Sequence, residues 1–319
     1  MRVVSLLASG TEIVCALGAG DMLVGRSHEC DNPSWVRSLP ACSEPAFDIS
    51  VSSREIDAEV NRRVRSGEPL YHIHTDLIRE LTPDLIIAQE HCDVCAVTPA
   101  DVEKSGCEMP AGRVLSLTAQ SLDDIFGSIM QIAIAVGREE AGRAVAQQEK
   151  HRLETVRQRT AGRRRPTLVM LEWMAPPFAS GNWSPELVEI ANGDLLLGTK
   201  GEHSRAIPSE QILAADPEYL IVAPCGFNLE RTLRERAAAL EALSWWSALG
   251  AVQTGKVAFA DGNLFFNRSG MTVSQTAEII AEILHGVTFG TPTEGVHWCW
   301  MERLRQFEES SLILEQRQG

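Results

Sequence analysis

The sequence predicts an α/β protein in which two Rossmann-like parallel-sheet lobes are bridged by one long backbone helix. Short apolar strand patterns alternate with helical patterns at the start of the chain, and the same alternation begins again after Pro166. The stretch between the two alternating regions has a helical pattern throughout. We therefore expect residues 1–120 and 166–290 to form the lobes, 121–165 the linking helix and 291–319 a tail.

The first lobe contains short apolar runs that lack a polar alternation, which is typical of strands covered on both faces of a sheet. The predicted strands are Val3–Ala8, Leu23–Arg26, Leu85–Ala88 and Val114–Leu117. Helices are expected directly after the first strand, over Ser52–Ser66 and over Thr75–Leu81.

From Ser121 to about Thr160 the helical pattern is continuous, and it opens with the capping signal Ser121-Leu-Asp-Asp. Up to about 40 helical residues would span roughly 60 Å, which is longer than one lobe. We therefore interpret this stretch as the connector.

The second lobe repeats the pattern of the first. Its predicted strands are Thr167–Leu171, Tyr219–Ala223 and Lys256–Ala260, and its helices are Ser184–Ala191, Pro208–Ala214, Leu229–Leu240 and Met271–Leu284. The tail from Thr291 carries Trp298 and Trp300, and we expect it to pack a short helix onto the body.

Charge and hydropathy exclude several classes of partner. The 319 residues include 43 acidic and 29 basic side chains, a formal net charge of −14, which disfavours nucleic acids and anionic membrane surfaces. No run of about 18 apolar residues exists, so no membrane insertion is expected. Glu12 interrupts the apolar N-terminal run and argues against a secretory signal. We expect a cytoplasmic protein whose eight cysteines stay reduced.

Cysteines, histidines and aromatic residues gather in the loops that follow the predicted strands. Ligands of open parallel sheets bind beyond the carboxyl ends of the strands, so these loops predict a site. In the first lobe they hold Ser9, Thr11 and Glu12, then His28 and Cys30, then His91, Cys92 and Cys95. In the second lobe they hold Glu172, Trp173 and Trp183, then Cys225 and Phe227, then Phe265 and Arg268.

The spacing Cys92-x-x-Cys95 is typical of metal knuckles and of redox motifs. Together with Cys30, and with His28 or His91, it makes a Cys3His-type set that would suit zinc or another thiophilic metal. Cys225 joins these candidates as a strand-end thiol. A thiol-redox role and buried, inert thiols are the alternatives.

Aromatic residues on the second-lobe loops predict a flat, bulky ligand such as a macrocycle or a siderophore. Trp173 and Trp183 stand among prolines and glycine, outside any helical stripe, and Phe227 and Phe265 repeat the theme. Arg268 would pair either with an acidic substituent of the ligand or with a carboxylate in a surface salt bridge.

Several segments carry a family resemblance. These are the opening VVSLLASGTEIVCALGAGDMLVGRSHECDNP, the strand LTPDLIIA and the segment GKVAFADG. They resemble the class III substrate-binding proteins of ABC importers, the helical-backbone receptors for vitamin B12, haem, iron siderophores and metals. The resemblance covers about residues 1–287. HECDNP, QEHCDVCAV, EWMAPPFASGNWSPE and APCGFNLE are most similar to a leaderless branch often described as cobalamin-binding.

The resemblance implies a two-lobed receptor that holds its ligand between the lobes. We expect a cytoplasmic binding protein for a corrinoid such as cobalamin, in which the Cys/His loop coordinates cobalt or iron or holds a separate zinc ion. An ABC permease is a conceivable partner. The alternatives are a receptor for a metal, a siderophore or haem, a metal- or thiol-dependent enzyme, and an interaction scaffold. No GxSxG, GxxxxGK[ST] or HExxH motif occurs, which disfavours the enzyme.

Overall fold

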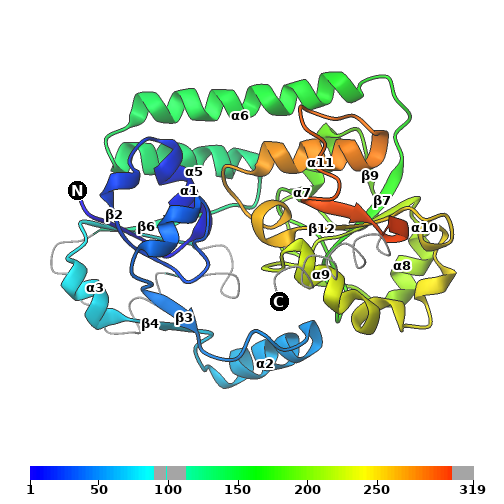
Figure 1. Cartoon of the computed structure of the whole chain (residues 1–319), viewed down its shortest axis with the longest axis horizontal. Helices are drawn as coiled ribbons and strands as arrows, with labels where there is room; N and C mark the ends of the chain where they lie inside the picture. Colours follow the sequence, from blue (N-terminus) through cyan, green and yellow to red (C-terminus); the bar gives the residue numbers. More distant parts are fainter. Residues whose placement is uncertain (90–97, 99–112, 304–319) are drawn as a thin grey trace, which may run out of the picture. The chain divides into compact units, whose positions relative to one another are not determined.

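The structure, a computed structural model, describes residues 1–89, 98 and 113–303 (Figure 1). The chain divides into two compact units. Unit 1 consists of Met1–Arg152 and Arg268–Ser274, and unit 2 of Leu153–Asn267 and Gln275–Gly319. Unit 1 contains a parallel sheet and unit 2 a mixed sheet with a parallel centre, each with helices, so the predicted α/β class is confirmed.

The core of unit 1 is a four-stranded parallel sheet in the order β2-β1-β5-β6. The strands are β1 (Val3–Ser5), β2 (Leu23–Arg26), β5 (Leu85–Gln89) and β6 (Arg113–Leu117). All residues of β1 and β5 are buried, as expected for strands covered on both faces. The first strand is shorter than predicted, because the helix that follows it already begins at Ala8.

Helices cover the sheet of unit 1, and α1 packs against α5 (Figure 1). The helices are α1 (Ala8–Ala16), α3 (Thr75–Leu81) and α5 (Leu122–Ala135). A separate antiparallel pair, β3 (Ser43–Pro45) and β4 (Tyr71–Ile73), flanks α2 (Ser53–Ser66) in sequence. Ser52 and Glu55 form a capping box that starts α2, and Gly67, with φ of 70°, ends it.

The stretch predicted as one continuous helix is two helices, so that part of the prediction is wrong. Ser121 starts α5 with a capping box, and Gly137 adopts φ of 68° two residues after α5 ends. A residue without Cβ reaches this left-handed conformation easily, and it turns the chain out of the helix. The second helix, α6 (Glu139–Thr160), has 22 residues and is roughly 33 Å long. It contains the boundary between Arg152 and Leu153.

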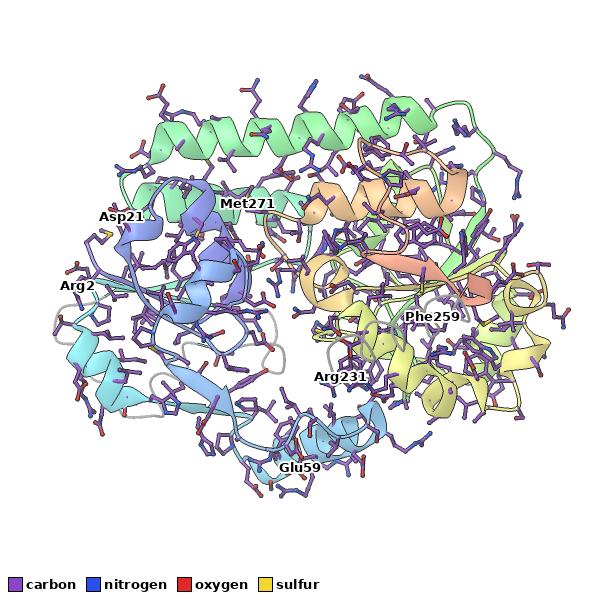
Figure 2. All side chains as sticks on the ribbon, in the orientation of Figure 1. Arg2, Asp21, Glu59, Arg231, Phe259 and Met271 are labelled. Atoms are coloured by element: carbon purple, nitrogen blue, oxygen red, sulfur yellow. The ribbon has the colours of Figure 1, made fainter. Side chains whose placement is uncertain are left out.

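Unit 2 is built on a seven-stranded mixed sheet. The strands are β7 (Thr167–Trp173), β8 (Phe178–Ala179), β9 (Asp194–Leu195), β10 (Arg205–Ala206), β11 (Tyr219–Val222), β12 (Val257–Ala260) and β13 (Trp298–Trp300). The central pairs β7–β11 and β11–β12 are parallel, as predicted. The antiparallel strands β8, β10 and β13 extend this centre. Phe259 of β12 is fully buried in it (Figure 2).

Four of the five helices described after β7 lie close to predicted positions, whereas the short helix Gly250–Gln253 was not predicted. The five are α7 (Ser184–Ile190), α8 (Ser209–Ala215), α9 (Leu229–Arg236), α10 (Gly250–Gln253) and α11 (Val273–His285), with π-helical turns at Ala237–Glu241 and Gly262–Phe266. Short 3₁₀ turns occur at Gly20–Met22, Ser34–Ser38, Trp246–Ala248 and Met301–Arg303. No helix in the described part of the chain is long and apolar enough to cross a membrane.

The described part of the tail differs from its prediction, because Trp298 and Trp300 lie in strand β13 rather than in a helix. This strand pairs antiparallel with β12. The Trp298 indole donates a hydrogen bond to Thr293 Oγ1 over 3.1 Å, and the Thr293 hydroxyl donates to Glu282 on α11 over 2.5 Å. The described part of the tail is therefore held by the β12–β13 ladder and by a partly buried chain of hydrogen bonds.

Candidate functional site

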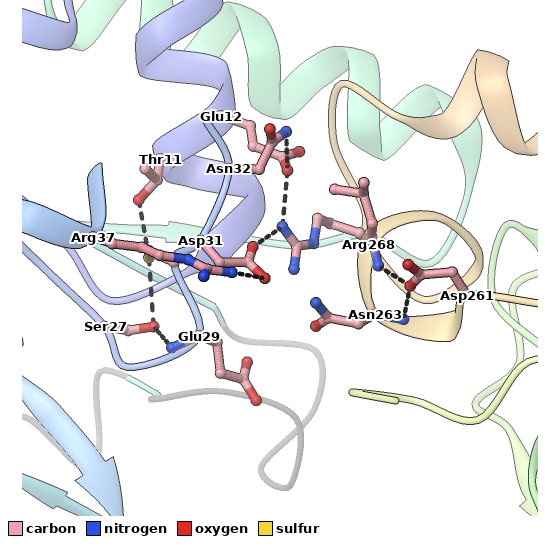
Figure 3. A network of polar contacts seen from close by, with 12 residues as sticks. Thr11, Glu12, Ser27, Glu29, Asp31, Asn32, Arg37, Asp261, Asn263 and Arg268 are labelled. Atoms are coloured by element: carbon pink, nitrogen blue, oxygen red, sulfur yellow. Dashed lines mark hydrogen bonds and ion pairs between the residues drawn. The ribbon is translucent and has the colours of Figure 1, made fainter. Parts of the chain in front are cut away.

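Unit 1 contains a buried ion cluster. It is formed by residues that follow β1 and β2 in the sequence and by Arg268. Arg268 Nη1 is 2.9 Å from Glu12 Oε1 and 2.7 Å from Asp31 Oδ1 (Figure 3). Asn32 donates a second hydrogen bond of 2.9 Å to Glu12 Oε1. Glu12 is 3% exposed and Arg268 is 5% exposed, so both charges are almost removed from water. The two carboxylates therefore hold the guanidinium inside unit 1.

Burial and charge act against each other in this cluster. Burial raises the pKa of Glu12, although Arg268 and Asn32 counteract it. Burial also opposes the charge on Arg268, but attraction by Glu12 and Asp31 outweighs it and raises the pKa of the guanidinium. The neighbouring Glu29 has its pKa raised to about 7, chiefly by burial. Among the described residues Glu12 Oε2 has no hydrogen-bond partner, so this carboxylate is only half satisfied.

Small polar groups surround the first turn of α1. Ser9 Oγ lies 3.4 Å from Ser269 Oγ. Thr11 donates a hydrogen bond of 3.0 Å to the sulfur of Cys30, and the Cys30 thiol is 3.5 Å from Ser27 Oγ. Burial raises the pKa of Cys30, so its sulfur stays protonated at neutral pH. A protonated, buried thiol is a poor metal ligand.

His28 has the features of a neutral imidazole. Its Nδ1 lies 3.0 Å from Ser43 Oγ, and its ring centroid is 5.4 Å from that of Tyr71. Burial, together with the nearby Arg26 and against the opposing effect of Glu44, lowers the pKa of His28 to about 4. The ring is partly exposed and uncharged at pH 7, which is the form that binds metals.

The predicted metal set is only partly within the described residues. His91, Cys92 and Cys95 lie outside them. Within the described ranges, no group of three or more His, Cys, Asp or Glu side chains could hold a metal ion. Cys225 belongs to unit 2, where its N–H donates a hydrogen bond of 2.8 Å to the Glu172 carbonyl. The metal site stays a prediction.

In unit 2 an aromatic pair follows two neighbouring parallel strands. Trp173 is the last residue of β7, and Phe227 follows β11. Their ring centroids are 5.2 Å apart at an interplanar angle of 61°. Trp173 is partly exposed, whereas Phe227 is 2% exposed. The guanidinium carbon of Arg231 lies 3.7 Å from the Phe227 centroid, so a cation covers that ring.

The other two predicted aromatic contacts are inside unit 2. Trp183, directly before α7, is 5% exposed, and its indole nitrogen has no hydrogen-bond partner among the described residues. Phe265 is 3% exposed and packs against His297, with centroids 4.6 Å apart. Glu172 is partly exposed at the end of β7. The roles of these residues in ligand binding stay predictions.

Sequence reasoning did not select Asp31 and Asn32 as site residues. Both follow Cys30 in the loop after β2. Asp31 accepts a hydrogen bond from Arg268, and Asn32 donates one to Glu12. The available signal was their place beyond a strand end next to selected residues. Among the selected residues, the structure brings together Glu12 with Arg268, Thr11 with Cys30, and Trp173 with Phe227.

Two α/β units, each with parallel strands at the centre of its sheet and a candidate site after the strand ends, are the architecture of a substrate-binding protein. Residues 3–264 match the model of the periplasmic binding protein family, and the chain belongs to this family. It is 23% identical to the uncharacterized ABC transporter substrate-binding lipoprotein YvrC of Bacillus subtilis (strain 168) over 297 residues, 90% of this chain and 81% of that protein.

Two solved structures show the same fold. The periplasmic vitamin B12 binding protein BtuF of Vibrio cholerae has a TM-score of 0.63 at 20% identity, covering 88% of this chain and 95% of that one. A periplasmic heme binding protein from Pseudomonas aeruginosa has a TM-score of 0.69 at 17% identity, covering 94% and 97%. The expected likeness to the class III substrate-binding proteins is confirmed.

Proposed function

We propose that this chain binds a corrinoid such as cobalamin as its small-molecule ligand. The observation that carries the proposal is the Trp173–Phe227 pair, which places a partly exposed indole at the carboxyl ends of two neighbouring parallel strands. A large flat ring is the ligand that such an aromatic surface suits best. Similarity to proteins whose names state vitamin B12 or haem binding supports a macrocycle.

In unit 1, His28 is our candidate for a residue that coordinates cobalt or iron. Its imidazole is neutral at pH 7, and its Nδ1 shares a hydrogen bond with Ser43 Oγ. Among the described residues Nε2 has no hydrogen-bond partner, so this nitrogen is the one to coordinate cobalt or iron. The buried Cys30 thiol is the weaker candidate, because its raised pKa keeps it protonated.

The aromatic surface is tested by titration of the purified chain with hydroxocobalamin, followed by calorimetry and absorption. We expect Trp173→Leu to weaken binding by about tenfold or more, which corresponds to about 1.4 kcal/mol. The matched control is Trp35→Leu, which removes a 46% exposed tryptophan of unit 1. If the native chain shows neither a heat of binding nor a spectral change with hydroxocobalamin, the corrinoid proposal is wrong.

The role of His28 is tested separately from the aromatic surface. With hydroxocobalamin we expect the native chain to shift the absorption bands, and His28→Gln to abolish the shift. His72→Gln, which changes an exposed histidine of the same unit, should leave the shift intact. An unchanged shift in His28→Gln would show that another group, or none, coordinates the metal.

Haem is the second candidate, because several of the similar solved proteins are named as haem-binding. The same titration with haemin decides between them: tighter binding of haemin than of hydroxocobalamin would favour haem. Delivery to an ABC permease and a cytoplasmic location stay predictions. Co-purification with a permease and cell fractionation test them.

A further inference from the structure

The chain crosses from one unit to the other at three points, of which two lie inside helices and one does not. The first lies inside α6, between Arg152 and Leu153. The third lies inside α11, between Ser274 and Gln275. The second, between Asn267 and Arg268, follows the π-helical turn Gly262–Phe266 and is not in a helix. Within the described residues it is therefore the one crossing whose backbone torsions are not fixed by a helix.

Asn267 is anchored in unit 2. Its Nδ2 donates hydrogen bonds of 2.8 Å to the Ala223 carbonyl and 3.1 Å to the Gly262 carbonyl. Both acceptors belong to buried residues at the end of β11 and in the turn after β12. Losing this amide would leave two buried carbonyl groups without one of their donors, which is costly.

Arg268 is anchored in unit 1 by the two carboxylates of the ion cluster. The residues that follow it, Arg268–Ser274, form a strap that is fixed to unit 1 along its length. Gly270 packs so closely that a Cβ there would lie 2.8 Å from the Ser9 Cβ. At the far end, Ser274 Oγ lies 2.5 Å from Glu149 Oε2, and Glu149 is 3% exposed.

We propose that the Asn267–Arg268 junction is a double anchor that couples the two units mechanically. One peptide bond joins two residues whose side chains are held by different units. A rearrangement that displaces one of the two residues therefore displaces the other, because only a few backbone torsions separate the two anchored side chains. Loosening Arg268 in unit 1 destabilises the turn around Asn267 in unit 2, and the reverse holds, because coupling between two sites is reciprocal.

Hydrogen–deuterium exchange of the full ligand-free chain, read by mass spectrometry, tests the coupling. We expect Arg268→Met to speed amide exchange in the strap by about tenfold or more. The diagnostic readout is in unit 2, where exchange over 262–267 should rise at least about threefold. Arg234→Met, which removes an exposed arginine paired with Glu230 in unit 2, should change neither segment.

The reverse experiment uses Asn267→Ala, with Asn61→Ala on the exposed face of α2 as its control. We expect faster exchange in the strap and in the loop that contains Asp31. If each variant loosens its own unit and leaves the other as in the native chain, the anchors are independent and the proposal is wrong. Should Arg268→Met fail to fold, Arg268→Lys and Asn267→Ala still decide the question. None of these measurements involves a ligand, so their outcome is separate from that of the proposed function.

Discussion

Arg268→Met should destabilise the chain by an amount that depends on pH in a predictable way. The change keeps an unbranched apolar side chain, shorter than that of arginine, and removes the charge that pairs with Glu12 and Asp31. Breaking one partner out of a buried ion pair generally costs about 3–5 kcal/mol, because the remaining charge stays buried. Glu12, at 3% exposed, is that remaining charge, whereas Asp31 reaches water with 23% of its side chain.

Proton uptake by Glu12 sets the pH dependence. Without Arg268 burial would raise the pKa of this carboxyl further in the folded state, while the unfolded chain ionises near the ordinary pKa of 4.5. A raised folded pKa means that the folded state binds more protons, so stability falls as pH rises. The loss amounts to about 1.4 kcal/mol per pH unit at most, or about 3.4 kcal/mol between pH 4.5 and pH 7.

Urea unfolding at pH 5, 6, 7 and 8, followed by circular dichroism, measures this dependence. We expect the gap between the native chain and Arg268→Met to widen with pH. The double variant Glu12→Gln/Arg268→Met has no carboxyl to ionise, so most of the slope should vanish. A gap that is the same from pH 5 to pH 8 would refute the idea that Glu12 is left as an unpaired buried charge.

Three further substitutions test local features of the fold by urea unfolding at pH 7. Gly25→Ala should cost about 1–3 kcal/mol, because the new Cβ would lie 2.6 Å from Cys42 Sγ; a neutral result would show that β2 has spare room. Gly127→Ala in α5 meets nothing within 4 Å and should stabilise the chain by about 0.5–1 kcal/mol, and a loss would contradict this. Ser121→Ala removes the capping box with Asp124 and should cost about 1 kcal/mol, unless water replaces the cap without loss.

Local signals located most of the helices and strands. Leu23–Arg26 and Thr75–Leu81 coincide with the observed strand and helix, because turn residues bound both patterns. The break at Gly137 was missed, since the apolar periodicity alone did not reveal the left-handed turn. The strand of Trp298 and Trp300 was missed for another reason: its partner β12 is distant in sequence, and strand pairing cannot be inferred from a local pattern.

The candidate site shows the same division between local and distant information. The strand-end rule selected Glu12 and Arg268 independently, each as a ligand contact. Their contact joins residues 256 positions apart and depends on the return of the strap to unit 1. No spacing or composition signal connects them in the sequence.

This pairing changes how an acidic ligand would be recognised. In the folded chain the guanidinium of Arg268 is turned toward two carboxylates, one of them almost fully buried. An acidic substituent of a ligand would have to compete with both of them, and displacement would leave Glu12 as an unpaired buried charge. We therefore expect Arg268→Met to affect strap exchange and stability far more than it affects the preference between a ligand with an acidic group and one without. Titrations of the variant with hydroxocobalamin and with cobinamide, which lacks the phosphate-bearing nucleotide loop, check this. Equal losses for both ligands would fit a positioning role of Arg268, and a loss confined to hydroxocobalamin would contradict it.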